Sequence, residues 1–408
     1  MMNTTKVKQI YTEVMNRIKN IHIGCFGGME KPLLLISDEY PGLWLEHVYD
    51  SVLFATMEPE HIHLAENAIM LFIDNQRENG HIPFAVMDKS KRPHEQVVYG
   101  QIQECVSFLT LAMEVYEMNK NKEFLEKVYK AGKKWNVWMR KSRMVTNRGL
   151  IEMFVGFDTG HDASARLDGM SCKGNYMIDG VRQDADILPP DDGITPILAV
   201  DMNCNFYANE MALAKMAGIL GFTEESEKWK LSASEIKNKL FEYCYDEEDL
   251  FFYDVDRNGN KRKYKSSTIF HLFLEKVLDK KEDAELIDKI YRQHIKNPEE
   301  FWTPYPFPSM AINDPSVEGH RTFNCWGYYT QGLIVLRAIR WMDYYGWNKD
   351  LDYICEKWIE TWTNHYETIK MAQEIDPITG VPTISSEWYS SCMIMYIYSV
   401  RRLGLIKS

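Results

Sequence analysis

Apolar side chains recur every three or four residues along most of the chain, which is the spacing of one face of an α-helix. In the segment 60–76, for example, Ile62, Ile69 and Phe72 fall on one face. Gly221 follows another such segment and is a natural helix stop. The same period predicts further helices over 101–117, 123–141, 201–220, 224–243, 268–278, 284–294, 330–345, 349–366 and 388–403. The chain is therefore predicted to be mainly helical.

Strand-like runs are few, and no alternation of strands and helices appears. One run, 250–255, predicts a hairpin through the Asp256-Arg257-Asn258-Gly259 turn. Neighbouring helices are often joined by short connectors, and no Pro- or Ser-rich linker divides the chain. An α-solenoid would show a repeat of roughly 35 to 45 residues, which the sequence lacks. We therefore predict an all-α (α/α)6 barrel, a toroid of paired antiparallel helices, as a single domain over 1–408.

In such a toroid the informative residues are those in polar loops between helices. Four loops stand out: 157–166, 373–380 continued by 385–389, 46–51 and 79–83. The first contains two Asp, one His and one Arg. Taken alone, it fits a helix cap with a surface ion pair as well as it fits a catalytic acid.

The composition is typical of a globular protein, and the net charge excludes some classes of partner. Apolar residues make up 45% of the 408 residues and charged residues 26%, as in a globular protein. Aromatic residues reach 13%, a high share that serves either core packing or stacking on sugar rings. The net charge of −12, without a basic run, argues against nucleic acid or an anionic membrane as a partner.

The eight cysteines are scattered without a Cys-x-x-Cys pair, as expected for buried free thiols in a reducing compartment. The N-terminal segment is amphipathic and lacks an apolar signal core, and no apolar run reaches the length of a membrane span. We predict a cytoplasmic enzyme. The apolar segment 394–400 is either core or interface, so a homo-oligomer stays open.

Metal and cofactor motifs are weak. Asp254, Asp256 and Asn258 begin like a calcium loop, but Lys265 stands where the twelfth position needs Glu. The two imidazoles of His61-x-His63 do not share a helix face. No phosphate- or dinucleotide-binding glycine pattern is present. We predict neither a metal nor a cofactor.

The polar loops together resemble a known group of enzymes. Segment 49–51 resembles a Trp-Asp-Ser motif, 75–83 an NQ…NGxIP stretch, 159–166 the pattern S-G-x-D-x-S-x-R, 201–203 a D-L-N, and 374–380 the pattern E-x-(N/D)-P-x-T-G. These motifs, in this order, resemble those of the inverting glycoside hydrolases that include trehalase, processing α-glucosidase and bacterial mannosylglycerate and glucosylglycerate hydrolases.

The resemblance implies hydrolysis of a small α-linked sugar with inversion at the anomeric centre. Asp162 would be the general acid and Glu374 the general base, roughly 6.5 to 9.5 Å apart, with Glu387 as the rival base. Repulsion from Asp158 could raise the pKa of the acid and an inward-pointing Arg166 would lower it, and the sequence leaves the balance between them open. The candidate substrate-binding residues are Tyr49, Asp50, His81, Gln101, His161, Arg166, Trp326, Glu387 and Trp388.

Two departures bear on the substrate. The family often has W-R-G-P where this chain reads Asn324-Cys325-Trp326-Gly327, and Tyr49 replaces Trp. The chemistry therefore resembles the family's, while the substrate is expected to differ from its commonest one. A trehalase-type disaccharidase, a helical epimerase or unsaturated-uronyl hydrolase, and a sugar-binding protein without activity are the alternatives. The two carboxylates argue against the last three, and the sugar itself stays open.

Overall fold

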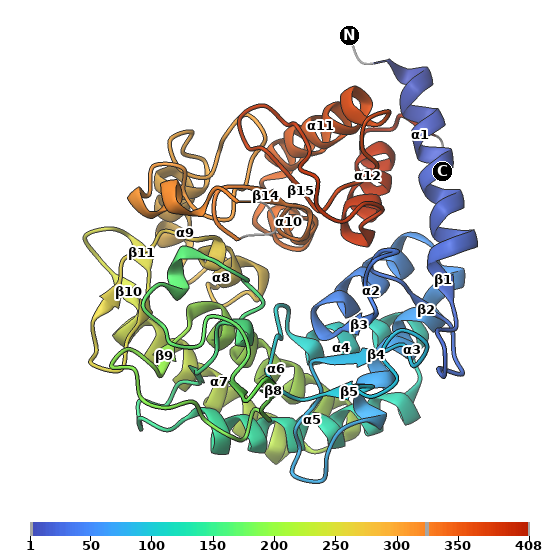
Figure 1. The fold of residues 1–408 in the computed structure, drawn as a ribbon. Coiled ribbons are helices and arrows are strands. Elements are labelled where there is room, and N and C mark those ends of the chain that lie inside the picture. Colours follow the sequence, from blue (N-terminus) through green and yellow to red (C-terminus); the bar gives the residue numbers. More distant parts are fainter. Residues whose placement is uncertain (1–2, 323–325, 407–408) are drawn as a thin grey trace. The chain divides into compact units, whose positions relative to one another are not determined.

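The computed structural model describes residues 3–322 and 326–406, and the chain forms two compact units (Figure 1). Unit 1 comprises Met1–Gly42, Lys265–Ser267 and Asp279–Ser408, and unit 2 comprises Leu43–Tyr264 and Thr268–Leu278. Whether they act as one domain, as the sequence predicts, stays a prediction.

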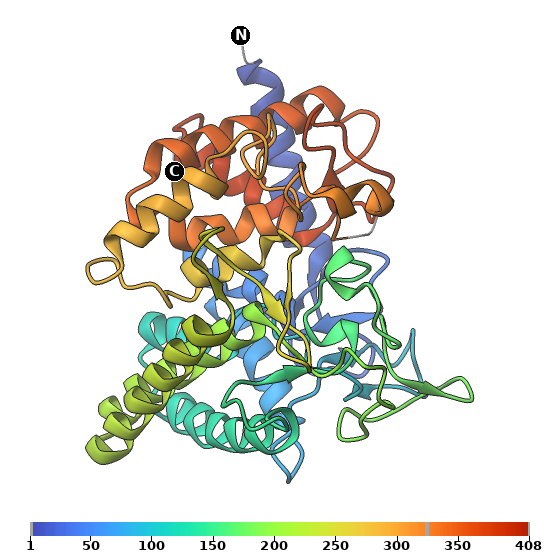
Figure 2. The same ribbon diagram turned by 90° about the vertical axis from the view of Figure 1, so that its left-hand side faces the viewer.

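Unit 2 is built mainly from helix pairs that follow one another along the chain. The pair α6 and α7 lies side by side along its length (Figures 1 and 2). Gly221 ends α6 in the left-handed conformation, with φ of 86°, and Phe222 N then donates to Ala217 O, so the chain reverses at once. The helices are α2 (Val48–Met57), α3 (Ile62–Asp74), α4 (Phe108–Asn119), α5 (Lys122–Arg143), α6 (Val200–Leu220), α7 (Thr223–Tyr243) and α8 (Phe270–Leu274).

Short strands join the loops of unit 2. Asp254 pairs with Arg262 across the turn that the sequence predicts, which confirms that hairpin. One sheet has the order β13-β12-β9-β6, from Lys261–Arg262, Asp254–Val255, Ile197–Leu198 and Glu152–Met153. The others are β3 (Gly42–Trp44) with β4 (Ala85–Met87) and β5 (Val97–Val98), β7 (Met177–Ile178) with β8 (Val181–Arg182), and β10 (Tyr245–Asp246) with β11 (Phe251–Phe252).

Unit 1 packs its helices around α12, which is buried along most of its length. Helix α1 lies beside α12 (Figure 1) and buries Val7, Ile10 and Val14, one turn apart. The helices are α1 (Thr4–Arg17), α9 (Ala284–Ile290), α10 (Gly332–Tyr345), α11 (Asn348–His365) and α12 (Ser390–Arg402). Two strand pairs complete the unit: β1 (Ile23–Gly24) with β2 (Leu33–Leu34), and β14 (Thr330–Gln331) with β15 (Glu374–Ile375).

Short helical segments of three to six residues fill several connectors. They are Ile18–His22, Leu45–His47, Pro59–His61, Gly156–Asp158, Ala165–Leu167, Ser267–Ile269, Tyr291–Ile295 and Pro315–His320. Within 3–322 and 326–406, no helix is both long and apolar enough to cross a bilayer.

Three sequence predictions are wrong at the polar loops. The segment 46–51 is not a loop, because α2 begins at Val48. The predicted helix 101–117 begins only at Phe108, because the Ser107 hydroxyl caps it by accepting from Thr110 N. Glu374, placed in the polar loop 373–380 by the sequence, lies instead in the strand β15 (Glu374–Ile375).

Candidate active site

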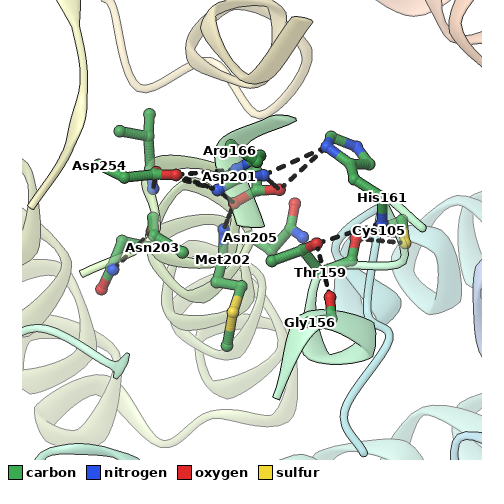
Figure 3. A network of polar contacts seen from close by, with 12 residues as sticks. Cys105, Gly156, Thr159, His161, Arg166, Asp201, Met202, Asn203, Asn205 and Asp254 are labelled. Carbon is green, nitrogen blue, oxygen red and sulfur yellow. Dashed lines mark hydrogen bonds and ion pairs between the residues drawn. The ribbon is translucent and has the colours of Figure 1, made fainter. Parts of the chain in front are cut away.

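Asp162 lies in a tight turn of unit 2 whose backbone is held in place on both sides. Gly160 and Ala163 have φ of 70° and 54°, in the left-handed region. Ser164 N donates to His161 O at 3.3 Å, and His161 N donates to Thr159 Oγ1 at 3.1 Å (Figure 3). A left-handed alanine is unfavourable and persists where its surroundings impose it, as functional loops often do.

Gly160 is where the turn approaches the rest of the unit most closely. A Cβ atom there would lie 2.3 Å from Cys105 Sγ and 3.4 Å from Glu46 Oε2. Cys105 Sγ also donates to Thr159 O at 3.1 Å. The acid loop is therefore seated directly on Cys105 and Glu46.

The Asp162 carboxyl has the protonation behaviour of a general acid. It is only partly exposed. Burial, and then the negative charge of Glu46, raise its pKa to about 7. The carboxyl therefore keeps its proton over much of the range in which glycosidases work.

Glu46, rather than Asp158, supplies the repulsion that the sequence left open, because the Asp158 carboxylate accepts hydrogen bonds from the backbone. Its Oδ1 atom accepts from Ile102 N at 3.0 Å, and Oδ2 accepts from Phe154 N at 3.1 Å. Arg143 Nε lies 3.8 Å from it. Asp158 organises the loops around the acid, while Glu46 supplies the nearby negative charge.

The Glu46 carboxylate ends a buried chain of two amide side chains, of which the sequence predicted only Gln101. Gln103 donates to Glu46 Oε1 at 3.0 Å, and Gln101 donates to Gln103 Oε1. Gln103 has a left-handed backbone, with φ of 49°. The Oε1 atom of Gln101 is buried and has no hydrogen-bond partner among the described residues. An unpaired buried acceptor is costly, so this atom is well placed for a ligand hydroxyl.

Arg166 is fully engaged with protein groups (Figure 3). Its Nε donates to Asp254 Oδ2. Its Nη1 donates to Asp201 Oδ2 and lies 3.2 Å from His161 Nδ1. Its Nη2 donates to Asp201 Oδ1 and to Asp254 Oδ1. All five N–H donors of a guanidinium are thereby used. Although burial raises the pKa of Asp201, Arg166 holds it below its usual value. The geometry favours a positioning role for Arg166 over direct sugar contact.

His161 and two neighbours have the spacing of a metal site. Atoms of His161, Asp201 and His271 all lie within 4.8 Å of one another. The Arg166 guanidinium, however, already binds both oxygens of Asp201, so a second cation would be repelled. Two further groups of this kind are Glu58 with Glu60 and His61, and His81 with Asp184 and Asp186.

His81 lies within an aromatic cluster of unit 2. Its ring stacks on Trp138, with centroids 3.9 Å apart and planes at 8°. Burial, followed by the charges of Arg143 and Arg77, holds its pKa well below the usual value. The imidazole is therefore neutral, and its stacking is core packing.

Tyr49 and Asp50 lie in the first turn of α2, and each is 1% exposed. Asp50 Oδ2 lies 3.1 Å from His47 Nδ1. Asp162, Glu46 and the Gln101 chain lie in the same unit as these two residues.

Glu374, the predicted base, lies in β15 of unit 1 and is fully buried. Gln331, its partner across the strand pair, donates to Oε2, and Thr383 Oγ1 donates to Oε1 at 3.2 Å. Hydrogen bonds to both oxygens fix the carboxyl group in one orientation, as a base that must aim at one water requires.

Glu387, the rival base, is exposed, and its Oε1 accepts from Lys370 N at 2.8 Å. It thus holds a surface loop. The next residue, Trp388, has φ of 52° and is partly exposed. Trp326 is buried, with the Arg337 Cζ 5.8 Å from its ring centroid. The altered positions Asn324 and Cys325 lie outside the described residues.

Comparison with known proteins identifies the family. The family model of the mannosylglycerate hydrolase MGH1-like glycoside hydrolase domain matches residues 50–389. The chain belongs to the MGH1-like glycoside hydrolase family. This confirms the resemblance to inverting (α/α)6-barrel glycoside hydrolases that the ordered motifs indicate, and the enzyme class with it.

Solved structures show the fold of this MGH1-like chain. The GH63 mannosylglycerate hydrolase from Thermus thermophilus, in complex with glucose, superposes with a TM-score of 0.71 at 16% identity, over 96% of this chain and 99% of that one. Neutral trehalase Nth1 from Saccharomyces cerevisiae gives 0.67 at 15% identity, over 92% and 75%. The predicted all-α (α/α)6 barrel is confirmed.

A curated relative from Borreliella burgdorferi, described as an uncharacterized protein, is 29% identical over 134 residues. The match covers 32% of this chain and spans only 26% of that relative's length.

Proposed function

We propose that this MGH1-like chain is an inverting, exo-acting α-glycosidase that cleaves a short oligosaccharide or a glycosylated small molecule. Asp162 is its general acid and Glu374 its general base. The observation that carries the proposal is the Asp162 carboxyl, seated on Glu46 in an imposed turn, with a pKa of about 7.

In this mechanism Asp162 donates its proton to the glycosidic oxygen as the bond to the anomeric carbon breaks. Glu374 takes a proton from a water molecule, whose oxygen attacks the anomeric carbon from the opposite face. The products are a free alcohol and a sugar of inverted configuration. Asp162 is left ionised and Glu374 protonated, and exchange with solvent restores both.

The names of the similar proteins give the first substrates to test. Mannosylglycerate comes from the Thermus enzyme, trehalose from the yeast trehalase, and an α-1,6-mannoside from a Streptococcus pneumoniae α-mannosidase of the same fold, with a TM-score of 0.61. Glucosylglycerate and aryl α-glycosides complete the panel. Cleavage of one of them identifies the sugar.

Proton NMR of the fresh reaction tests the stereochemistry. We expect the β-anomer to appear first from an α-glycoside, followed by slow mutarotation. Early α-anomer would show retention and would exclude the water-activating role of Glu374.

A matched pair of variants separates acid from base. Asp162→Asn removes the proton donor, so it loses alkyl glycoside hydrolysis but keeps turnover of a glycosyl fluoride, whose leaving group needs no protonation. Glu374→Gln loses both. Glu387→Gln tests the rival base, and it keeps turnover of both substrates if Glu374 is the base. If Glu387→Gln lost activity and Glu374→Gln kept it, the base would be Glu387.

The proposal includes a cytoplasmic location. The seven cysteines within the described residues are free thiols, which a reducing compartment preserves. Cell fractionation tests the location. Light scattering on the purified chain decides whether it forms a homo-oligomer.

A further inference from the structure

The loop 385–390 in unit 1 rests on a segment that precedes the family match, which begins at residue 50. Ser386 Oγ donates to Glu39 Oε2 at 2.6 Å, and Ser390 N donates to Ile36 O at 2.7 Å. The rings of Tyr40 and Tyr389 meet edge-on, with centroids 5.8 Å apart. The segment 36–40 thus holds the loop at both ends.

Arg17, the last residue of α1, reaches the middle of the same loop. Its guanidinium carbon lies over the Trp388 ring, 4.8 Å from the centroid. The guanidinium also forms an ion pair with Asp38. Its side chain is 20% exposed, and its Nε atom is buried without a partner among the described residues. A guanidinium that is anchored and stacked in this way covers one face of an indole.

The surroundings impose the unusual backbone of Trp388. Its φ of 52° is in the left-handed region, which a bulky residue adopts only when neighbours enforce it. Trp388 N donates to Lys370 O at 2.8 Å, and the Tyr366 ring meets the indole at 87°, with centroids 6.2 Å apart. The loop also reaches the base strand, since Gln373 N donates to Ser386 O at 3.1 Å.

We propose that Arg17 is a positioning residue for Trp388: it occupies one face of the indole and presents the opposite face to the sugar ring. Asp38 fixes the guanidinium, and segment 36–40 fixes the loop. Helix α1, which precedes the family match, thereby contributes a side chain that supports the sugar site. This inference rests on the proposed function and on the prediction from the sequence that Trp388 binds the substrate.

The kinetic test uses the full chain with the substrate that the panel identifies, beginning with mannosylglycerate. Arg17→Met keeps a side chain of similar length but removes the charge and the ion pair. We expect KM to rise about 3- to 10-fold, with a smaller change in kcat, and Arg17→Lys to recover part of the loss. Asp38→Asn, which releases the guanidinium without changing it, is expected to act in the same direction.

Arg401→Met is the matched control. Arg401 lies on α12, with its Cζ 5.8 Å from the Tyr11 ring and its Nε donating to the Tyr11 hydroxyl on α1. Its loss disturbs the packing of α1 in the same unit without touching Trp388. If Arg401→Met raised KM as much as Arg17→Met, the effect would be structural and the proposal would be wrong.

A second readout does not depend on turnover. In protein labelled with 5-fluorotryptophan, the fluorine resonance that disappears in Trp388→Phe belongs to Trp388. We expect Arg17→Met to shift or broaden that resonance, Arg17→Lys to bring it back in part, and Arg401→Met to leave it unchanged. An unchanged resonance in Arg17→Met overturns the positioning role even if the glycosidase activity is confirmed. A shifted resonance without hydrolysis of any panel member refutes the proposed function but leaves the contact between Arg17 and Trp388 intact.

Discussion

Glu46 and Asp162 form a pair of carboxyl groups in which burial, and then the charge of Glu46, raise the pKa of Asp162. Glu46 reaches the acid loop where Gly160 leaves room, 3.4 Å from the place of a Cβ atom. The two residues lie far apart in the sequence and come together because Gln103 holds the Glu46 carboxylate beside the loop. Two like charges in one site disfavour the second ionisation.

Removal of the Glu46 charge is therefore expected to change the pH profile. The acid works while protonated, so activity falls as pH rises through its pKa of about 7. Glu46→Gln lowers that pKa, and the alkaline limb of the kcat/KM profile moves to lower pH by about half to one unit. Glu46→Asp keeps the charge and serves as the control. An unmoved limb in Glu46→Gln would show that burial alone sets the pKa.

Ionisation of the buried Asp162 carboxyl is expected to lower the free energy of unfolding. Its folded-state pKa is raised above the unfolded value, so the folded state binds the extra proton, and stability falls as pH rises from about 4 to 7. Asp162→Asn cannot ionise, so the free energy of unfolding of this variant lacks that fall between about pH 4 and pH 7. We expect the inactive variant to be more stable by roughly 1 to 2 kcal/mol at pH 7, after allowance for solvent screening, and equally stable near pH 4. Urea denaturation at the two pH values measures the difference, and a variant less stable at pH 7 contradicts it.

The long helices could be predicted because each is encoded within its own segment. The period of 201–220 and the stop at Gly221 match α6 to within one residue. The conformations of the loops could not be predicted in this way, because they depend on contacts with distant segments. Gln101 lies in an apolar, helix-like run, but the helix begins only after the Ser107 cap, and Gln103 donates to Glu46, which lies far back in the chain.

The surroundings of Glu374 could not be predicted from its own segment either. Its motif was readable in the sequence, yet its strand partner Gln331 lies on a distant segment. Glu46 stood within a loop that the sequence singled out, but only its approach to Gly160 shows what it does. Local pattern thus identified the chemistry-bearing loops, and contacts between distant segments decided which of their residues act together.

The Arg166 network is expected to be a large contributor to the stability of unit 2. Arg166→Leu leaves the carboxylates of Asp201 and Asp254 buried without a cation. Loss of one member of such a buried ion group costs about 3 to 5 kcal/mol. Arg182→Gln, which removes a partly exposed pair with Glu95, is the matched control and is expected to cost about 0 to 1 kcal/mol. Urea midpoints compare the two, and equal losses would contradict the structural role of Arg166.

Gly160 offers the most local test of the acid loop, because the chain contains a matched glycine. Gly160 and Gly180 have φ of 70° and 78°, but a Cβ atom meets Cys105 Sγ at 2.3 Å in the first case and nothing within 4 Å in the second. Gly180→Ala should therefore show only the left-handed backbone cost, about 1 to 2 kcal/mol. Gly160→Ala adds overpacking of roughly 1 to 3 kcal/mol and displaces Asp162 from Glu46, so kcat falls as well. A combined variant with Cys105→Ala makes room for the new methyl group and is expected to recover part of both losses. If it recovers stability but not kcat, the backbone of the turn, rather than the contact, orients Asp162.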